Sequence, residues 1–262
     1  MNLRTLQEKI LRGELGSDPE SVCVTGAVSM YQTTQFPGSS VKYRNHYLLL
    51  RVQEAFGACS HTPEQLAAEA AEECSGRSVA QLLRDPRLPV RVAAMDAYLA
   101  AMRPHRLACR EAADIAAGTP LEKAQRRDAQ IAETAQIVPG SKVALIGVVN
   151  PLIEAIEQRG GICLPCDLQM DYTQRGQRVE KDMHIVLDQA DSVICTGMTL
   201  SNGSFDSIVE KVRARGVPLT VYAQTGSAAA ARFVGEGVSR VVAEPFPFTQ
   251  FSGGVSELFI YH

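Results

Sequence analysis

Hydrophobic and polar positions follow two different patterns along the chain, and the pattern changes near residue 138. In the second part, short runs of consecutive apolar residues such as 143–149 and 193–195 alternate with helical stretches. Continuous apolar runs of this length are typical of strands that are buried on both faces of a parallel sheet. The repeated alternation of strand and helix predicts an α/β fold over residues 138–262, a Rossmann-like, doubly wound parallel sheet.

The same pattern places the individual elements of this part. We expect strands at 141–149, 161–167, 191–197, 217–226 and 238–245. Helices are expected at 151–160, 180–190, 204–216 and 227–237. Pro151 and Gly160 mark the start and the end of the first helix.

The first part of the chain is organised differently. Two β-rich runs, 21–34 and 42–54, flank the segment 35–41, whose Pro, Gly and Ser residues favour a turn. Helical patterns follow at 61–73, with Thr62 as its N-cap, and at 78–85 and 89–102. Strands followed by helices predict a smaller α+β domain over residues 1–105. Residues 106–137 are charged and helical in pattern, which predicts a connector.

Composition argues against several classes of function. The 262 residues carry a formal net charge of −3 and no Trp, so we expect no nucleic-acid partner. No apolar run reaches the roughly 20 residues that cross a bilayer, and residues 1–13 form a surface-helix pattern and not a signal peptide, so we expect no membrane partner. Seven scattered Cys residues indicate reduced thiols in a cytoplasmic protein. Homo-oligomer formation stays open.

Three predicted strand ends are polar and contain glycine, at 147–151, 195–204 and 223–227. In open parallel sheets, ligands bind beyond the carboxyl ends of the strands, where the strand order reverses. Each of these ends leads into a helix whose first backbone N–H groups lack partners, so each could hold an anion or a carbonyl. Asn150 and Thr225 are therefore candidate ligand-binding residues.

The segment 195–206 has the highest density of polar groups. The polar side chains belong to Thr196, Thr199, Asn202, Ser204 and Asp206, and Gly197 permits the close approach of a ligand. Asn202 or Ser204 is expected to cap the following helix, and the remaining hydroxyls could simply face water. Because these groups outnumber what a cap requires, we predict that all six residues belong to a ligand site.

Other patterns limit the chemistry. The segment 147–152 has one glycine where a dinucleotide fingerprint has three, so NAD is not expected. Asp167 ends the second strand, where an acid commonly holds a ribose hydroxyl, so it is a candidate ligand-binding residue and S-adenosylmethionine is an alternative cofactor. Cys166 and Asp167 are candidate metal ligands, although Cys163 and Cys166 lack the second Cys pair of a zinc site. No catalytic motif is recognisable, so enzymatic activity stays open.

Several segments resemble one known family. Residues 142–156, 190–209 and 223–243 are similar to the Rossmann-like half of the heavy-metal chelation family, first described as a domain of unknown function. Members share a strand–TG–T–NGT–D–helix segment, with Ser204 here in place of Thr; the matching residues are Thr196, Gly197, Thr199, Asn202, Gly203 and Asp206. Residues 34–41 and 83–102 resemble the family's enolase-N-terminal-like domain, with Asp96 where Asn is expected.

The resemblance implies a cap domain docked on the Rossmann-like domain, a site in the cleft between them and a link to metal handling. The sequence contains no obvious His/Cys ligand cluster. A metal ion is therefore expected to arrive already held by a small organic ligand, whose carboxylates the loops would bind. Tyr31, Thr33 and Arg44, beside the 35–41 turn, are predicted to reach across from the N-terminal domain.

Three functions stay open. The chain binds or processes a small metal-chelating metabolite, of the metallophore or metal-chelate type, in the cleft. Alternatively, it is an enzyme that uses S-adenosylmethionine or another nucleoside-bearing substrate for a transfer or elimination reaction. The third hypothesis is a non-enzymatic sensor or assembly protein.

Overall fold

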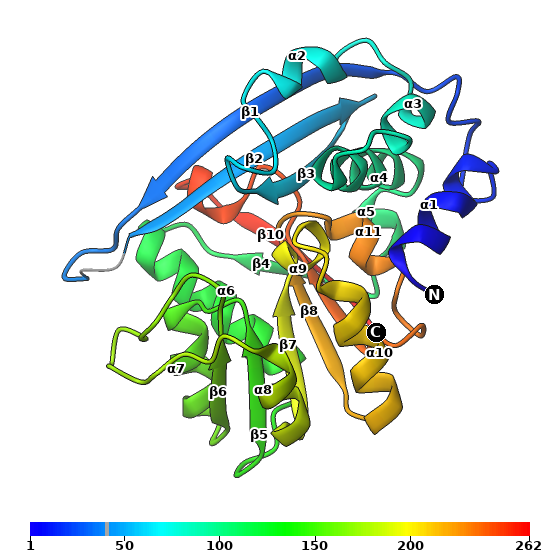
Figure 1. Ribbon diagram of the computed structural model, residues 1–262. Helices are drawn as coiled ribbons and strands as arrows, with labels where there is room; N and C mark the ends of the chain where they lie inside the picture. The colour runs from blue at the N-terminus through cyan, green and yellow to red at the C-terminus, as the bar shows by residue number, and fades with distance from the viewer. Residues whose placement is uncertain (40–41) are drawn as a thin grey trace.

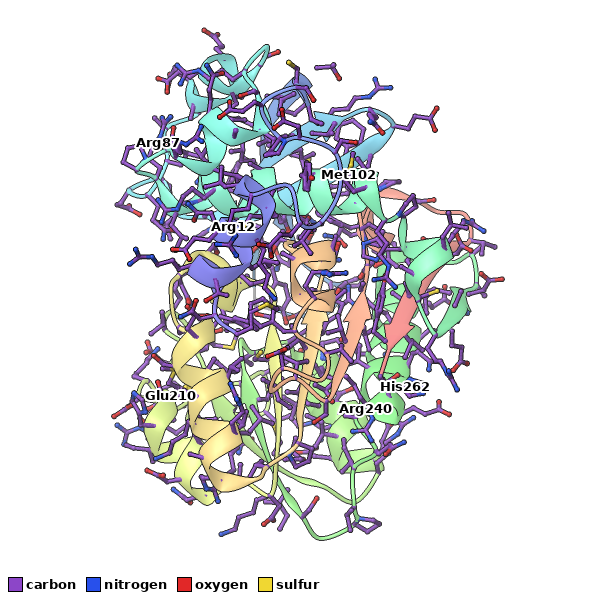
Figure 2. All side chains as sticks on the ribbon, turned by 90° about the vertical axis from the view of Figure 1, so that its right-hand side faces the viewer. Arg12, Arg87, Met102, Glu210, Arg240 and His262 are labelled. Atoms are coloured by element: carbon purple, nitrogen blue, oxygen red, sulfur yellow. The ribbon has the colours of Figure 1, made fainter. Side chains whose placement is uncertain are left out.

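The computed structural model describes residues 1–39 and 42–262. It contains a small antiparallel sheet and a larger, mostly parallel sheet, both accompanied by helices, as the sequence predicts (Figure 1). Seen from the side, the N-terminal domain lies above the larger sheet (Figure 2). The parallel strands point their carboxyl ends toward it. In the described part of the chain, no helix is both long and apolar enough to cross a membrane.

The N-terminal domain is built on a three-stranded sheet in the order β1-β2-β3. Its elements are α1 (Leu3–Leu11), β1 (Val24–Thr34), β2 (Tyr43–Val52), β3 (Ala55–His61), α2 (Ala70–Cys74), α3 (Val79–Leu83), α4 (Leu88–Met102) and α5 (His105–Ala108). Helix α4 is buried on almost every side because it lies between this sheet and the C-terminal domain. Gly57 of β3 permits this packing, since a Cβ there would lie 1.9 Å from the backbone N of Ala97.

The C-terminal domain is built on a seven-stranded sheet in the order β4-β10-β9-β8-β7-β5-β6. Strands β5 to β9 are parallel, and β10 is antiparallel to both β9 and β4. The strands are β4 (Glu111–Ile115), β5 (Lys142–Ile146), β6 (Ile162–Cys166), β7 (Ser192–Thr196), β8 (Leu219–Ala223), β9 (Arg240–Ala243) and β10 (Ser256–Tyr261). The helices are α6 (Pro120–Thr134), α7 (Asn150–Gln158), α8 (Met183–Gln189), α9 (Met198–Ser201), α10 (Phe205–Arg215) and α11 (Ser227–Ala231), with a 3₁₀ turn at Thr249–Phe251.

Four segments differ from the sequence-based expectation. The predicted helix at 61–73 is present only as α2, because residues 62–69 run across the sheet, where Ser29 Oγ donates to the Ala68 carbonyl (2.6 Å). Residues 106–137, expected as a connector, contain β4 and α6 of the larger domain. Strands β3 and β10 were not predicted. The predicted turn at 35–41 is described only to Ser39, since 40–41 lie outside the described residues.

Candidate functional site

The strand order of the larger sheet reverses at β5, which has β6 on one side and β7 on the other. The loops after β5 and β7 therefore meet at the position where such sheets bind ligands. At this position Gly147 has a φ of +90°, and a Cβ on it would lie 2.5 Å from Thr196 Oγ1. Thr196 is 8% exposed, and its buried hydroxyl oxygen has no hydrogen-bond partner. Such a group is an expected attachment point for a ligand atom or a water molecule.

Asn150, at the start of α7, joins three parts of the molecule. Its Nδ2 donates to the Tyr43 hydroxyl of β2 (2.9 Å), and its Oδ1 accepts from the backbone N–H of Gln174 (2.9 Å). The side chain is buried. This predicted residue therefore lies at the junction of the N-terminal domain, α7 and the loop after β6.

A hollow of about 140 Å³ borders Asn150 and lies between the two domains. The N-terminal domain contributes Phe36, Pro37 and Ser39. The C-terminal domain contributes Leu121 and Gln125 of α6, Asn150, Pro151 and Glu154 of α7, and Gln174. The wall thus combines apolar surface with amide, hydroxyl and carboxylate groups, a mixture typical of sites for small molecules.

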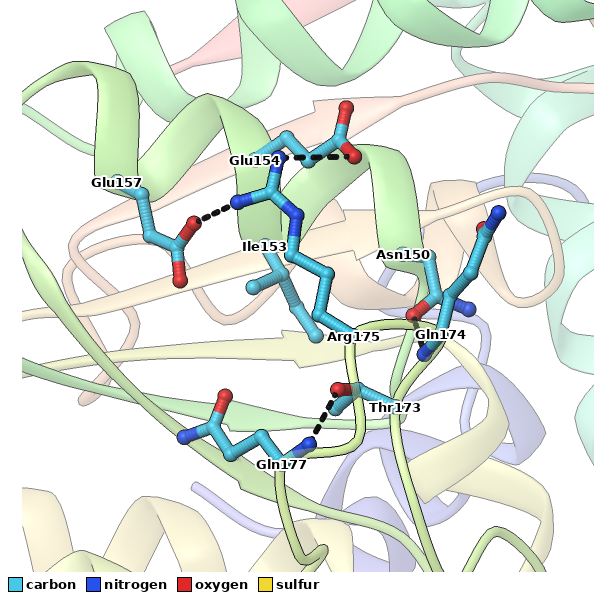
Figure 3. A pocket seen from close by; sticks show the side chains of 8 residues that line it. All are labelled: Asn150, Ile153, Glu154, Glu157, Thr173, Gln174, Arg175 and Gln177. Atoms are coloured by element: carbon cyan, nitrogen blue, oxygen red, sulfur yellow. Dashed lines mark hydrogen bonds and ion pairs between the residues drawn. The ribbon is translucent and has the colours of Figure 1, made fainter.

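A second, smaller pocket shares Asn150, Glu154 and Gln174 with the hollow (Figure 3). Its volume of about 20 Å³ corresponds to roughly one water molecule. Arg175 lies across it, with guanidinium nitrogens 3.2 Å from a Glu154 oxygen and 2.7 Å from a Glu157 oxygen. These ion pairs line a space that holds no more than about one water molecule, so the larger hollow is the better candidate for a ligand.

The polar segment after β7 forms hydrogen bonds mainly within itself. Thr199 is buried, and its hydroxyl donates to the Thr196 carbonyl (2.8 Å). Asn202 is exposed, and its Oδ1 accepts from the Ser204 backbone N–H (3.0 Å) and hydroxyl (2.6 Å). Ser204 is the N-cap residue of α10 but makes no side-chain cap bond. None of Thr199, Asn202 and Ser204 lines either of the two pockets described above.

Three further residues of the predicted site, Asp167, Gly197 and Asp206, also contact other parts of the protein. Asp206 Oδ1 accepts from the Leu3 backbone N–H (3.0 Å), which attaches α1 to α10. Gly197 is close to the next loop, since a Cβ would lie 2.2 Å from the Thr225 carbonyl oxygen. Asp167 Oδ2 accepts from the Val148 N–H (3.0 Å), and its Oδ1 accepts from the backbone of the following turn. Asp167 thus joins the loops after β5 and β6.

The third strand end, after β8, is filled by a carboxylate from the N-terminal domain. Asp96 of α4 accepts from the N–H groups of Ala228 (2.7 Å) and Ala229 (3.4 Å) through Oδ1, and from Ala58 (2.9 Å) through Oδ2. Burial raises the pKa of Asp96 to about 7, although the N–H groups around it act in the opposite direction. Thr225, which precedes α11 in the same loop, is also buried. The loop after β8 was predicted to bind an anion or a carbonyl. In the structure its N–H groups bind the Asp96 side chain of the same protein.

The predicted contacts from the N-terminal domain lie on the outer face of its sheet. Tyr31, Thr33 and Arg44 are exposed, whereas the residues of opposite parity face the C-terminal domain. Among the latter, Tyr43 contacts Asn150. Gln32 Oε1 accepts from Gln250 Nε2 (3.4 Å). The sequence shows the alternation along these strands, but it does not show which face meets the other domain.

A buried charged cluster at the ends of β8 and β9 was not predicted. Arg127 donates to Asp128 (2.8 Å) and lies over the Tyr222 ring (5.1 Å from the centroid). The Tyr222 hydroxyl donates to Glu244 (2.6 Å), which also accepts from the Thr249 N–H. Burial raises the pKa of Tyr222 and Asp128. Arg127 and Asp128 lie in the segment interpreted as a connector, and no sequence signal marked them as interior.

The surroundings of Cys166 and Asp167, the two residues predicted as metal ligands, disfavour metal binding. Cys166 is buried, and burial raises the pKa of its thiol to about 11, which disfavours the thiolate that binds metals. Asp167 uses both carboxylate oxygens within the loops. Within residues 1–39 and 42–262, no three or more His, Cys, Asp or Glu side chains are grouped to hold a metal ion.

Comparison with known proteins supports the family resemblance. Residues 130–255 match the family model DUF364, described as "Putative heavy-metal chelation". The predicted resemblance is confirmed. DUF364 proteins of unknown function share the fold over nearly the whole chain: one from Desulfitobacterium hafniense DCB-2 (12% identity, TM-score 0.63, 98% of each chain) and one from Pyrococcus horikoshii (13% identity, TM-score 0.58, 97% of each chain). No curated protein matches the chain.

Proposed function

We propose that the chain binds a small organic ligand that carries a metal ion, in the hollow between the two domains. The observation that carries this proposal is the position of the hollow, at the switch-point helix α7 and against the N-terminal domain. A volume near 140 Å³ holds a group about the size of a benzene ring. The hollow could therefore take part of a chelating metabolite, with the remainder extending toward solvent.

The chemistry of the wall favours recognition of the organic part. Gln125 and Gln174 carry side-chain amides that can both donate and accept, and these groups suit ligand carboxylates, carbonyls and hydroxyls. Glu154 is the acid of the hollow, and its ion pair with Arg175 compensates its charge. The heavy-metal description of the family supports a chelate as cargo. The metal would then keep its organic ligands while bound.

The nucleoside alternative has weaker support. It relies on Asp167 to hold a ribose, and that carboxylate already accepts backbone N–H groups from two loops. S-adenosylmethionine therefore serves as a comparison compound in the test.

A thermal-shift screen tests the proposal. The panel contains Fe(III)–citrate, Ni(II)–histidine and Zn(II)–cysteine chelates, the free metals, the free organic ligands and S-adenosylmethionine. A chelate at about a hundredfold its Kd should stabilise the protein by about 2.7 kcal/mol. The stabilisation should fall to about 1.4 kcal/mol in Gln125→Ala and Gln174→Ala, as expected for tenfold weaker binding, and should be kept in Asn202→Ala. Stabilisation by S-adenosylmethionine alone, or no shift with any chelate, would contradict the proposal.

A further inference from the structure

Three aromatic side chains form a row on the outer face of the N-terminal sheet, one from each strand. Tyr31 of β1 is paired with His46 of β2, and His46 is paired with His61 of β3. The ring centroids of Tyr31 and His46 are 4.5 Å apart, and those of His46 and His61 are 5.8 Å apart. Directly opposite residues of antiparallel strands point to the same side, so the two imidazoles share one surface.

His61 is held in one tautomer. Its Nδ1 lies 3.0 Å from the carbonyl oxygen of Thr62, and because a carbonyl can only accept, Nδ1 carries the proton. In the neutral ring, Nε2 then has a free lone pair. A histidine that binds a metal through one nitrogen commonly donates its other N–H to a backbone carbonyl, as His61 does.

The free nitrogen of His61 is buried without a partner. The residue is 8% exposed, and Nε2 has no hydrogen-bond partner. A buried acceptor that lacks a partner destabilises the fold.

We propose that His46 and His61 together bind one divalent transition-metal ion of the nickel, copper and zinc group. Imidazole nitrogen suits these ions. With metal–nitrogen bonds of about 2.0–2.1 Å, two rings on one ion have centroids roughly 5–6 Å apart. The observed 5.8 Å matches this separation.

The row is exposed at its Tyr31 end and buried at its His61 end. Tyr31 is 55% exposed, His46 is half-buried and His61 is 8% exposed, so His46 is the ligand nearer to solvent. Two imidazoles leave coordination positions for water or for a small chelating molecule, since the described residues supply no group of three such side chains. The site is separate from the hollow and does not depend on the proposed function.

The other explanation for this arrangement is a row of stacked rings that only stabilises the sheet. The two explanations differ in what the His46 ring does. If the His46 ring only stacks on its neighbours, another planar side chain can replace it without changing how much metal the protein binds. As a ligand it is required for a stoichiometric site.

Isothermal titration with zinc chloride tests the proposal, with untagged, EDTA-treated full-length protein. The variants are His46→Gln and His61→Gln. His184→Gln on the exposed face of α8 is the matched control. We expect one zinc equivalent in the wild type and in His184→Gln, and affinity at least about tenfold weaker in the other two variants. His46 is half-buried, so its variant remains informative if His61→Gln does not fold.

Copper(II) electron paramagnetic resonance provides the second measurement. The wild-type spectrum should show hyperfine splitting from two imidazole nitrogens, and that of His46→Gln from one. Wild-type protein that binds no zinc stoichiometrically, or a His46→Gln variant with unchanged affinity and spectrum, would overturn the proposal. Loss of binding in His184→Gln would place the site on α8 and would overturn it equally.

Discussion

The loops after β5 and β8 occupy similar positions in the sheet but differ in what they contact. Each follows a buried parallel strand and leads into a helix at the same edge of the sheet. After β8, the N–H groups of Ala228 and Ala229 are taken by the Asp96 carboxylate of the N-terminal domain. After β5, Asn150 borders an open hollow. The same local chemistry thus serves domain docking in one loop and leaves space for a ligand in the other.

The loop after β7, which lies between these two in the sheet, extends this comparison. It has the most polar side chains, yet Thr199 and Asn202 bond to their own neighbours. The density of polar groups in a sequence therefore does not indicate how many of them face a ligand. What decides is whether nearby backbone groups already satisfy them.

The largest expected effect concerns this middle loop. In Gly197→Ala, the new Cβ would lie 2.2 Å from the Thr225 carbonyl oxygen, and the backbone cannot yield easily. We expect a loss of about 3 kcal/mol in the free energy of unfolding, measured with urea. Gly203→Ala is the control: its φ is +81°, but nothing lies within 4 Å, so a loss of about 1 kcal/mol is expected. Equal losses of stability in the two variants would show that the close packing of Gly197 against the Thr225 carbonyl does not determine the stability of this loop.

Asp96→Asn tests the filled loop after β8. An amide has one accepting oxygen, so the N–H of Ala58 or of Ala228 would face an NH₂ group. We expect a loss of about 2 kcal/mol at pH 5.

This loss should also depend on pH. The folded-state pKa of Asp96, about 7, lies above its ordinary value of 3.8, so its protonation stabilises the fold fully below pH 3.8. That contribution is lost as the pH rises through 7. The stability difference between wild type and Asp96→Asn, measured by urea unfolding from pH 4.5 to 8, should therefore narrow. A gap that widens with pH would mean that the carboxylate is favoured in the folded protein.

Asn150→Ala tests the open loop. It removes one bond to Tyr43 and one to Gln174, both at 2.9 Å in a buried position, so a loss of about 1.5 kcal/mol is expected. Asn202→Ala removes bonds at an exposed position and should change stability by less than about 0.5 kcal/mol. Denaturation of the two variants side by side measures the difference. A larger loss in Asn202→Ala would show that the hydrogen bonds of Asn202, after β7, stabilise the fold more than those of Asn150, after β5.

Thr196→Val should have the smallest effect. Without ligand the buried Thr196 hydroxyl has no protein partner, so its replacement should leave stability unchanged or raise it by up to about 1 kcal/mol. Differential scanning calorimetry of the free protein measures this. A clear loss of stability would mean that an ordered water molecule or another group satisfies the hydroxyl.

Local patterns explain why much of the fold could be predicted. Strands β5 and β7 contain short runs of consecutive apolar residues, 143–146 and 193–195, and α10 is followed by its C-cap residue Gly216, whose φ of +65° suits a left-handed cap. Strand β4 was missed because Glu111–Ile115 is mostly exposed at the sheet edge and has no apolar run. It is a strand because it pairs with β10, and β10 comes more than a hundred residues later in the sequence.

The candidate site was less predictable than the fold. Asn150 was identified from its strand end, and the hollow beside it lies between the domains. Gln32 and Tyr43, which face the C-terminal domain, were not identified from the sequence. A shift of one residue exchanges the two faces of a strand, so the alternation alone does not show which face meets the other domain. Asp96 was noted only as a departure from the family pattern. Its role depends on a contact with residues 132 positions away.

Isothermal titration tests most directly whether a ligand binds in the hollow beside Asn150. The titrant is the metal chelate that gives the largest thermal shift, and the proteins are wild type, Gln125→Ala and Asn202→Ala. We predict that Gln125→Ala weakens binding about tenfold, which corresponds to about 1.4 kcal/mol, and that Asn202→Ala binds like the wild type. Unchanged binding in Gln125→Ala together with lost binding in Asn202→Ala would contradict the account.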